Sequence, residues 1–306
     1  MKVWFLFERI SETHDWDLGL RELLSELKEC GDTWEILAGR AVYERWKTEK
    51  SYDWTDRDLV ISDDRAMVKE LAQSDIFCVG LESECKKERS SGYFEGTSLV
   101  VERLEALDAS FLRRELDRYH SRPVRIAETE RLLIRESRAG DFERLYAISR
   151  EKGNDRYTET MGTDKEAERE KFLAYINTVY AYHGSGLWTV IRKSDGAIAG
   201  WCGLIPDGAE KPEEPEIGYL IGQNFRRQGY AMEACQAVLH FAFEELEYAS
   251  ICARIRRGNY ASVVLAQKLG FCKTAQDHDE TYWKLSQTRY RLSTQSPNHV
   301  RKLFSL

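Results

Sequence analysis

The sequence of 306 residues contains no apolar stretch that approaches the roughly 18 residues needed to span a bilayer. The apolar run from Val3 to Phe7 is also too short for the core of a signal peptide, because Glu8 and Arg9 interrupt it. We therefore expect a cytoplasmic protein with no membrane partner.

The sequence also lacks a C-x-x-C pair, and its seven cysteines are odd in number and widely scattered. Most of them lie within apolar runs, which is typical of reduced cysteines in a hydrophobic core. The six histidines are equally dispersed. We expect neither a disulfide framework nor a bound metal.

The sequence has no excess of basic residues either, with 45 Lys and Arg against 52 Asp and Glu. The formal net charge of −7 argues against broad binding to nucleic acids. A hydrophobic fraction of 42% and a charged fraction of 32% are typical of a folded globular protein. The length is sufficient for two domains, each with its own core.

Residues 1–120 alternate between strand and helix patterns. Strands are expected near 2–7, 34–38, 59–62, 76–81 and 98–101, and helices near 18–27, 67–71 and 109–119. Strands separated by helices indicate a smaller α/β domain with a mostly parallel sheet.

The segment from Asp58 to Gly80 resembles the later half of a haloacid-dehalogenase-like or receiver-like α/β domain. Those families need an aspartate at the end of a strand beside further carboxylates that hold magnesium. The first strand offers only Glu8, and no D-x-D pattern follows it. We interpret Asp63 and Asp64 as loop and helix-capping residues and the domain as non-catalytic.

Pro123 disfavours a helix in the residue before it, so residues 121–127 are predicted to form a linker. A second domain is then expected at 128–286. Residues 287–306 form a basic tail, since no acidic residue follows Glu280. The tail could contact an acidic partner or RNA, but a solvated, poorly ordered terminus is the favoured interpretation.

The second domain shows strand patterns near 131–135, 187–193, 197–205 and 251–255, another strand that begins at Glu216, and a closing strand at 282–285. Helices are expected near 141–149, 166–180, 232–242 and 259–269, the second of them opened by a capping box from Thr163 to Glu166. Gly218 predicts a bulge or a close backbone approach. The whole indicates an α+β fold, with a mixed, mainly antiparallel sheet and helices on both faces.

The stretch EIGYLIGQNFRRQGYA, from Glu216 to Ala231, is the centre of this domain. A short apolar run ends in a basic, glycine-containing loop that opens a helix, and unpaired N–H groups in a first helical turn bind anions. Gly229 lets the backbone come close to a ligand, while Arg226 and Arg227 add positive charge. The alternative is an incidental surface turn.

Two further motifs accompany this loop: Asn259-x-x-Ser262 with Lys268-Leu-Gly-Phe271, and Glu130 to Arg135 with Asp141. Together with Arg226-x-x-Gly229-x-Ala231 they resemble the GNAT N-acetyltransferases, in particular the subgroup that acetylates ribosomal-protein N-termini and related amines. The resemblance covers about residues 125–286. It implies the GNAT fold, acetyl-CoA as co-substrate and a primary amine as acceptor.

The resemblance also implies roles for individual residues. Glu216 would be the catalytic base, because a partly buried carboxyl can have its pKa raised toward neutrality; otherwise it is an exposed glutamate at a strand end. N–H groups near Ile221 and Gly222 would bind the oxyanion. The pyrophosphate would be held by the loop and first helical turn, at Arg226, Arg227, Gln228, Gly229, Tyr230 and Ala231.

Asn259 and Ser262 would face the pantetheine arm and the thioester, although the type of Asn259 also suits a helix cap. Many family members carry a tyrosine as general acid where this chain has Ala266, so Ser262 or water would protonate the thiolate. The acceptor would meet Tyr157, Thr158, Glu159 and Met161, for which ordinary loop surface is the alternative.

Three functions therefore remain open at this point. The first is an acetyl-CoA-dependent N-acetyltransferase whose first domain recognises the acceptor or a partner. The second is a non-catalytic sensor or adaptor that binds acyl-CoA. The third is a phosphatase-like or phosphoreceiver activity of the first domain, which the missing D-x-D pattern disfavours. The sequence names neither the acceptor nor the oligomeric state.

Overall fold

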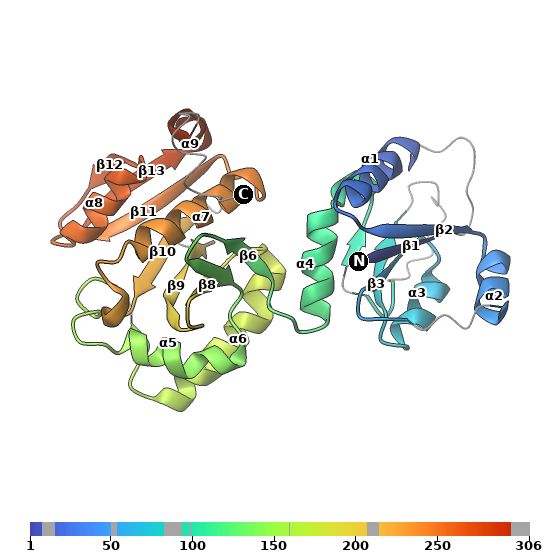
Figure 1. The fold of residues 1–306 in the computed structure, drawn as a ribbon, viewed down its shortest axis with the longest axis horizontal. Helices are drawn as coiled ribbons and strands as arrows, with labels where there is room; N and C mark the ends of the chain where they lie inside the picture. Colours follow the sequence, from blue (N-terminus) through green and yellow to red (C-terminus); the bar gives the residue numbers. More distant parts are fainter. Residues whose placement is uncertain are drawn as a thin grey trace. The chain divides into compact units, whose positions relative to one another are not determined.

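The computed structural model describes residues 1–7, 16–49, 54–82, 94–97, 99–158, 160–206 and 214–294 (Figure 1). The chain divides into two compact units, Met1–Arg122 and Pro123–Leu306. Each unit contains its own buried hydrophobic clusters. The residues Glu8 and Glu159 lie outside the described part.

Unit 1 is built on a five-stranded sheet in which every neighbouring pair is parallel. Its order is β2-β1-β3-β4-β5. The strands are β1 (Lys2–Phe7), β2 (Thr33–Ala38), β3 (Asp58–Ser62), β4 (Phe77–Leu81) and β5 (Leu99–Val101). The prediction of an α/β unit with a parallel sheet is confirmed.

Helices cover both faces of this sheet. They are α1 (Trp16–Glu29), α2 (Arg40–Glu49), α3 (Arg65–Ala72) and α4 (Ala109–Tyr119), with a short 3-10 turn η1 (Leu104–Ala106). Phe5 of β1 packs with α1 and α4, and its neighbour Trp4 packs with α2 and α3 on the opposite face. Asp64 caps α3 as predicted, since its carboxylate accepts hydrogen bonds from the N–H groups of Ala66 and Met67.

Unit 2 contains an eight-stranded sheet in the order β12-β13-β11-β10-β9-β8-β7-β6. The strands are β6 (Arg125–Glu128), β7 (Leu132–Arg135), β8 (Leu187–Arg192), β9 (Ile198–Ile205), β10 (Glu216–Ile221), β11 (Ser250–Arg256), β12 (Cys272–Gln276) and β13 (Glu280–Ser286). All neighbours are antiparallel except β10 and β11. The mixed, mainly antiparallel sheet is therefore confirmed.

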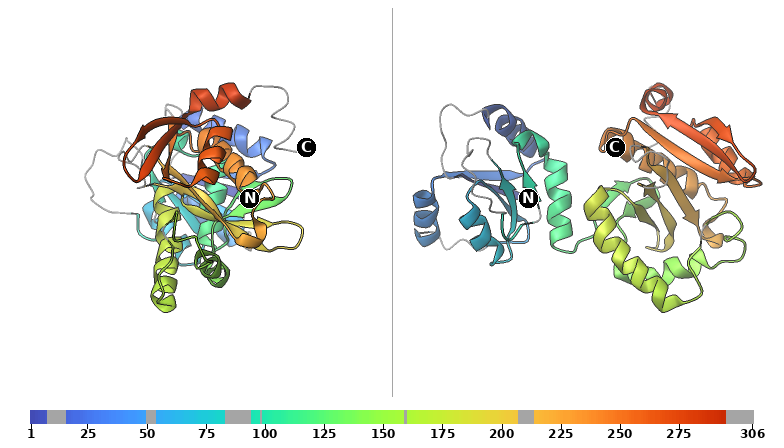
Figure 2. Two further views of the ribbon diagram at one scale, coloured as in Figure 1. Left: turned by 90° about the vertical axis from the view of Figure 1, so that its left-hand side faces the viewer. Right: turned by 180° about the vertical axis from the view of Figure 1, so that it is seen from behind.

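The helices of unit 2 are α5 (Phe142–Ser149), α6 (Lys165–His183), α7 (Tyr230–Glu244), α8 (Tyr260–Lys268) and α9 (Gln287–Thr294), with 3-10 turns η2 (Ala139–Asp141) and η3 (Gln223–Phe225). Trp188 of β8 packs edge-on against Phe241 of α7. The next residue, Thr189, instead bonds to Asp141 at the start of α5. Because successive strand residues point to opposite faces, α5 and α7 cover opposite faces of the sheet (Figure 2).

Several boundaries differ from the sequence predictions. β6 occupies part of the predicted linker, with Ile126 buried. The tail begins with α9 instead of coil, because Tyr290 is buried and stacks on Phe243 at 4.8 Å. Asp164 caps α6 in place of Thr163, by accepting a hydrogen bond from Ala167. Neither α2 nor β12 was predicted.

The predicted bulge at Gly218 is absent, because β10 pairs with β9 in continuous register. Gly218 instead allows a close approach of side chains: a Cβ there would lie 2.9 Å from Ile205 Cδ1. A register shift occurs instead between β8 and β9, where Val190 pairs with Gly200 but Ile191 pairs with Ile198. The Cβ of a larger residue at Gly200 would collide with the backbone of β10, since Leu220 O is only 1.9 Å away.

Candidate functional site

A fork between β10 and β11 forms the centre of unit 2. These two parallel strands are paired only at Glu216 and Cys252, after which they diverge. On its other side β10 bonds to β9, and Gly222 N donates to Ala199 O at 2.9 Å. Since antiparallel bonding alternates along a strand, the main-chain groups of Tyr219 and Ile221 face the open fork. The fork thus offers hydrogen-bonding backbone to an extended ligand.

This bonding corrects one sequence prediction. The N–H group of Gly222 is occupied by Ala199, so it is not available to an oxyanion. The N–H group of Ile221 points into the fork instead, because it alternates with that of Gly222.

At the open end of the fork, the loop from Arg226 to Gly229 leads into α7. Arg227 has φ of 60° and Gly229 has φ of 84°, the left-handed conformation that glycine tolerates without strain. No side chain caps α7 at Gly229. By contrast, Asp or Asn side chains cap α3, α4, α6 and α8. The first-turn N–H groups of α7 are therefore left for an anionic ligand.

The side chain of Arg226 bonds to other parts of unit 2. Its Nε donates to Ile221 O at 2.8 Å, and its Nη2 donates to Asn154 Oδ1 at 2.5 Å. Glu151 also anchors the region, because its carboxylate accepts from Gln223 N at 2.6 Å. Arg226 therefore ties the loop to the segment after α5, and Arg227, which is exposed, is the better placed charge for a phosphate.

A second arginine, Arg131 in the turn between β6 and β7, was recognised only as part of a motif. Its Nε donates to Glu233 in the first turn of α7 at 2.7 Å, and its Nη1 donates to Gln228 O at 2.9 Å. Its guanidinium also lies over the ring of Tyr230, 4.7 Å from the centroid. Arg131 thus brings a guanidinium to the loop from Arg226 to Gly229 and fixes its conformation from a turn about a hundred residues earlier.

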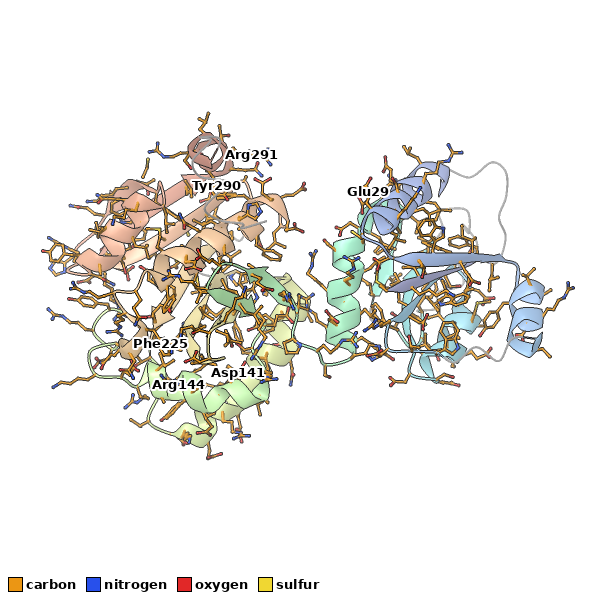
Figure 3. The ribbon with its side chains drawn as sticks, in the orientation of Figure 1. Glu29, Asp141, Arg144, Phe225, Tyr290 and Arg291 are labelled. Carbon is orange, nitrogen blue, oxygen red and sulfur yellow. The ribbon has the colours of Figure 1, made fainter. Side chains whose placement is uncertain are left out.

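The loop from Arg226 to Gly229 follows an aromatic residue, Phe225, that is packed between cationic side chains. Phe225 of η3 is buried, and the guanidinium of Arg144 lies over its ring, 6.0 Å from the centroid (Figure 3). The guanidinium of Arg192 also lies over this ring, 4.7 Å from the centroid. These cation–π contacts stabilise η3 at the point where the chain leaves β10.

Glu216 lies at the closed end of the fork and is buried, with 8% of its surface exposed. Its carboxylate accepts hydrogen bonds from Arg254 of β11, at 2.7 Å from Nε and 3.3 Å from the backbone N. Burial raises the pKa of Glu216, and the interactions with Arg254 offset only part of that rise. A carboxyl group with a raised pKa is suited to accept a proton near neutrality.

The other arm of the fork continues from β11 into α8. Asn259 caps this helix, since its Oδ1 accepts from Ser262 N at 3.2 Å. The hydroxyl of Ser262 accepts a hydrogen bond from Tyr219 of β10 at 2.8 Å. Ala266 is buried in the core of unit 2 and offers no hydroxyl. Tyr219 was not identified from the sequence, because a tyrosine within a strand gives no sign of a partner 43 residues away.

The segment between α5 and α6 carries the residues assigned to the acceptor. Tyr157 lies beside the turn before α8, where a Cβ on Gly258 would be 3.8 Å from its hydroxyl. The backbone of Met161 is held by Ser149, whose hydroxyl accepts from Met161 N at 2.8 Å. Thr158 N donates to Asn154 O at 3.1 Å. Tyr157 therefore comes near the fork, whereas Thr158 and Met161 show local contacts within this segment.

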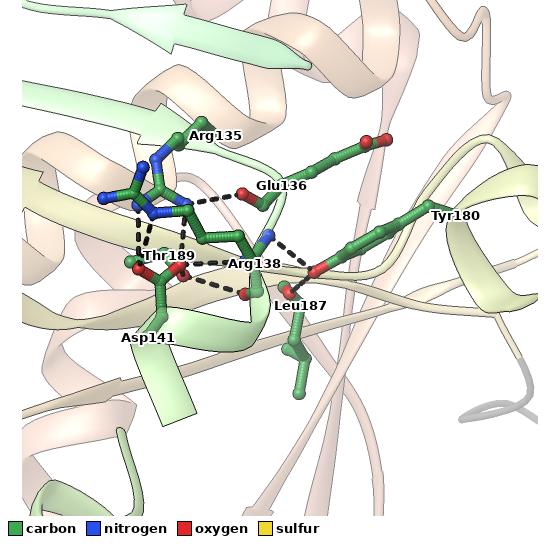
Figure 4. A network of polar contacts seen from close by, with 8 residues as sticks. Arg135, Glu136, Arg138, Asp141, Tyr180, Leu187 and Thr189 are labelled. Carbon is green, nitrogen blue, oxygen red and sulfur yellow. Dashed lines mark hydrogen bonds and ion pairs between the residues drawn. The ribbon is translucent and has the colours of Figure 1, made fainter. Parts of the chain in front are cut away.

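Arg135 and Asp141, which belong to the motif that begins at Glu130, form a buried ion pair on the α5 side of the sheet (Figure 4). Arg135 donates to both carboxylate oxygens of Asp141, at 2.6 and 2.9 Å. Arg138 N and Thr189 Oγ1 add further hydrogen bonds to the same carboxylate. The motif joins β7, β8 and α5, so we assign it a structural role.

Within the described ranges no group of three or more His, Cys, Asp or Glu residues could hold a metal ion. Among those same residues no helix is long and apolar enough to cross a membrane.

Comparison with known proteins gives a family-model match that lies in unit 2 and several similar proteins. The family model described as "Acetyltransferase (GNAT) domain" matches residues 131–272. The uncharacterised N-acetyltransferase YoaA of Bacillus subtilis is 30% identical over 151 residues, which are 48% of this chain and 83% of YoaA.

Two other matches are more limited. The uncharacterised protein YkkB of Bacillus subtilis is 36% identical over 88 residues, 29% of this chain and 51% of YkkB, so the chain spans about half the length of that relative. The crystal structure of an acetyltransferase of the GNAT family from Bacillus anthracis is 23% identical, with a TM-score of 0.45. Its match covers 53% of this chain and 98% of that one.

Proposed function

The chain belongs to the GNAT acetyltransferase family, and we propose that unit 2 transfers the acetyl group of acetyl-CoA to a primary amine by direct attack. The acceptor is a small-molecule amine or a protein N-terminus. We further propose that unit 1 helps to recognise the acceptor or a partner.

One observation carries this proposal: the fork has an uncapped helix N-terminus at its open end and a buried carboxylate at its closed end. The residues present fit acetyl-CoA. The N–H groups from Arg227 to Ala231 would hold the pyrophosphate. The main-chain groups of Tyr219 would pair with the pantetheine arm, which enters the fork, since Ile221 O already accepts from Arg226.

The reaction follows from the same geometry. Glu216 accepts a proton from the amine, which then attacks the thioester carbonyl. The N–H group of Ile221 stabilises the oxyanion that forms. The carbon–sulfur bond then breaks, and the sulfur takes a proton from Ser262 in the first turn of α8.

The test begins with calorimetric titration of the full chain with acetyl-CoA. Thiol release is then measured in the same sample against a panel of amines and peptide N-termini. Acceptor-dependent release is the expected result. Binding without release from any acceptor would favour an acyl-CoA sensor, and absence of binding would overturn the proposal.

Gly229→Trp should abolish the heat of CoA binding, because an indole would fill the turn at the N-terminus of α7. Gly184→Trp is the matched control. Gly184 also has a positive φ, 63°, and a Cβ there would meet no atom within 4 Å. Equal loss of binding in both variants would contradict the assigned site, because strain alone would then explain it.

Glu216→Gln should lower kcat by about 10² to 10⁴, the usual contribution of a general base, with little change in CoA affinity. Glu214→Gln is the control, because Glu214 lies two residues earlier and pairs with Lys284 at 2.5 Å. Wild-type turnover in Glu216→Gln would remove Glu216 from the mechanism.

A further inference from the structure

Tyr219 lies in the middle of β10, beyond the point at which β10 and β11 separate. Its hydroxyl crosses the fork and donates a hydrogen bond to Ser262 Oγ of α8 at 2.8 Å. One arm of the fork continues from β10 into α7, and the other continues from β11 into α8. The Tyr219–Ser262 bond therefore joins the two arms across the space assigned to the pantetheine arm and thioester.

The direction of this hydrogen bond determines what Ser262 is able to do. Because Ser262 Oγ accepts from Tyr219, its own proton remains available to another group. Within the ranges that the structure describes, the Ser262 hydroxyl donates to no other residue. Its position is fixed, since Ser262 N donates to Asn259 Oδ1. The side chain thus lies in the first turn of α8, where the helix dipole favours a developing negative charge.

The leaving group of the reaction needs such a donor. When a tetrahedral intermediate collapses, the sulfur of CoA departs as a thiolate and must be stabilised or protonated. The side chain of Ala266 on the same helix is buried and has no hydroxyl. A second hydroxyl is instead supplied by the opposite arm of the fork, at Tyr219.

We propose that Tyr219 is a positioning residue that makes Ser262 the proton donor to the leaving thiolate of CoA, an inference that rests on the proposed function. The carbon–sulfur bond breaks, its electron pair stays on sulfur, and Ser262 gives its proton to that sulfur. Tyr219 passes its own proton to Ser262 and regains one from solvent. The proton lost by the amine goes to Glu216 and then to solvent, so the steps balance.

The surroundings of Tyr219 keep it in its donor form. Burial raises the pKa of Tyr219 well above the ordinary value of a tyrosine. The titratable groups that act on it are the thiols of Cys202 on β9 and Cys235 on α7, and both add to that rise. The hydroxyl therefore stays protonated at neutral pH and above, and it donates to Ser262 throughout the range in which an amine would react.

The test measures the thiol of bound CoA, so it requires no known acceptor. CoA is bound to the full chain, and its thiolate is followed by ultraviolet absorbance as pH is varied. Tyr219→Phe and Ser262→Ala should each raise the pKa of the bound thiol by about one unit, because the first removes the bond that orients the Ser262 hydroxyl and the second removes the hydroxyl that bonds to the thiolate. The double variant should match Ser262→Ala, since Tyr219 acts through Ser262.

Two further variants separate this role from a purely structural one. Tyr260→Phe makes the same change on an exposed tyrosine of α8 and should leave the thiol pKa unchanged. Ser262→Thr keeps a hydroxyl and should retain the wild-type value. If Tyr219→Phe does not fold, Ser262→Ala against Ser262→Thr decides whether a hydroxyl at this position acts on the sulfur.

With an acceptor that the wild type uses, Tyr219→Phe should reduce kcat about tenfold and leave KM nearly unchanged, because the lost interaction forms only as the thiolate departs. If both Tyr219→Phe and Ser262→Ala bind CoA normally and keep the wild-type thiol pKa, the role of Tyr219 and Ser262 is overturned, but the proposed function is not. Failure of the wild type to bind CoA is a different result, and it would overturn the proposed function as well.

Discussion

Two opposing effects act on Glu216, the proposed base. Burial disfavours its charged form and raises its pKa. The hydrogen bonds and positive charge of Arg254 favour the charged form and lower the pKa, but by less than burial raises it. Because Arg254 is half-exposed while Glu216 is buried, substitution of Arg254 should change the electrostatics of the base without removing a core side chain.

Arg254→Gln should therefore raise the pKa of Glu216 further. If Glu216 must be ionised to accept the proton, the acidic limb of the profile of kcat/KM against pH should move to higher pH. The control is Arg257→Gln, because Arg257 is exposed and its Nη1 donates to the backbone of His278. An acidic limb that stays in place in Arg254→Gln would show that another group controls it.

Single residues were predictable where their role is local. Gly229 and Asn259 act within a few residues of their own position, as the φ of 84° and the helix cap show. Tyr219 was missed because its partner is distant in sequence, and Arg131 was not given its role at the anion loop for the same reason. The role of Arg226 at a phosphate stays a prediction, and its bond to Asn154 could not be foreseen because the two residues are 72 positions apart.

Among the secondary-structure elements, β7, β8 and α5 are held together by the carboxylate of Asp141. The side chain of Asp141 is 2% exposed, and the side chain of Arg135 that binds it is 11% exposed. Burial alone would raise the pKa of Asp141, but hydrogen bonds from Arg135, Arg138 and Thr189 outweigh it and lower the pKa. Loss of the charge would leave Arg135 buried without its partner.

Asp141→Asn should destabilise the protein by about 3 to 5 kcal/mol at neutral pH, as expected when one member of a buried ion pair is removed. The lowered pKa means that the wild-type advantage is complete above the ordinary carboxyl pKa of about 4 and is lost as pH falls through the folded-state value. Urea unfolding at a series of pH values would measure this.

The matched control is Asp195→Asn, which removes the carboxylate from the more exposed pair with Arg192 and should change the free energy of unfolding little. Equal effects of the two substitutions, or a difference between wild type and Asp141→Asn that persists at low pH, would contradict the assignment.

Elements with strong local signals were predicted well, and those that depend on packing were not. The long helix α6 has clear boundaries, with a capping Asp164 before it and Gly184 after it, and the strand β10 begins at Glu216 as predicted. By contrast, β6 has four residues, and among the side chains of α2 that the structure describes only Tyr43 is buried. The helix α9 depends on contacts of Tyr290 with Phe243, far from it in sequence. Tertiary contacts determine the secondary structure of such segments, so local sequence patterns do not predict them.

The whole molecule consists of two units with separate hydrophobic cores. The core of unit 1 is formed by the residues around β1, β3 and β4, and that of unit 2 by the residues around α7, β8 and β9. The proposed CoA site lies within unit 2. Since a ligand stabilises only the part of a protein whose unfolding destroys its site, CoA should act on the two units differently.

Scanning calorimetry of the full chain should show two unfolding transitions. CoA should raise the midpoint temperature of only one of them, the transition of unit 2. At a concentration about 100 times its Kd, CoA should add about 2.7 kcal/mol to the stability of unit 2. Gly229→Trp should lose this shift. Leu59→Ala removes a fully buried side chain from β3 and should reduce the free energy of unfolding of unit 1 by about 2 to 5 kcal/mol. The midpoint temperature of the CoA-sensitive transition should stay unchanged. A single transition that responds to both CoA and Leu59→Ala would mean that the units unfold as one cooperative body, and the role of unit 1 would then include the stability of the acetyltransferase unit.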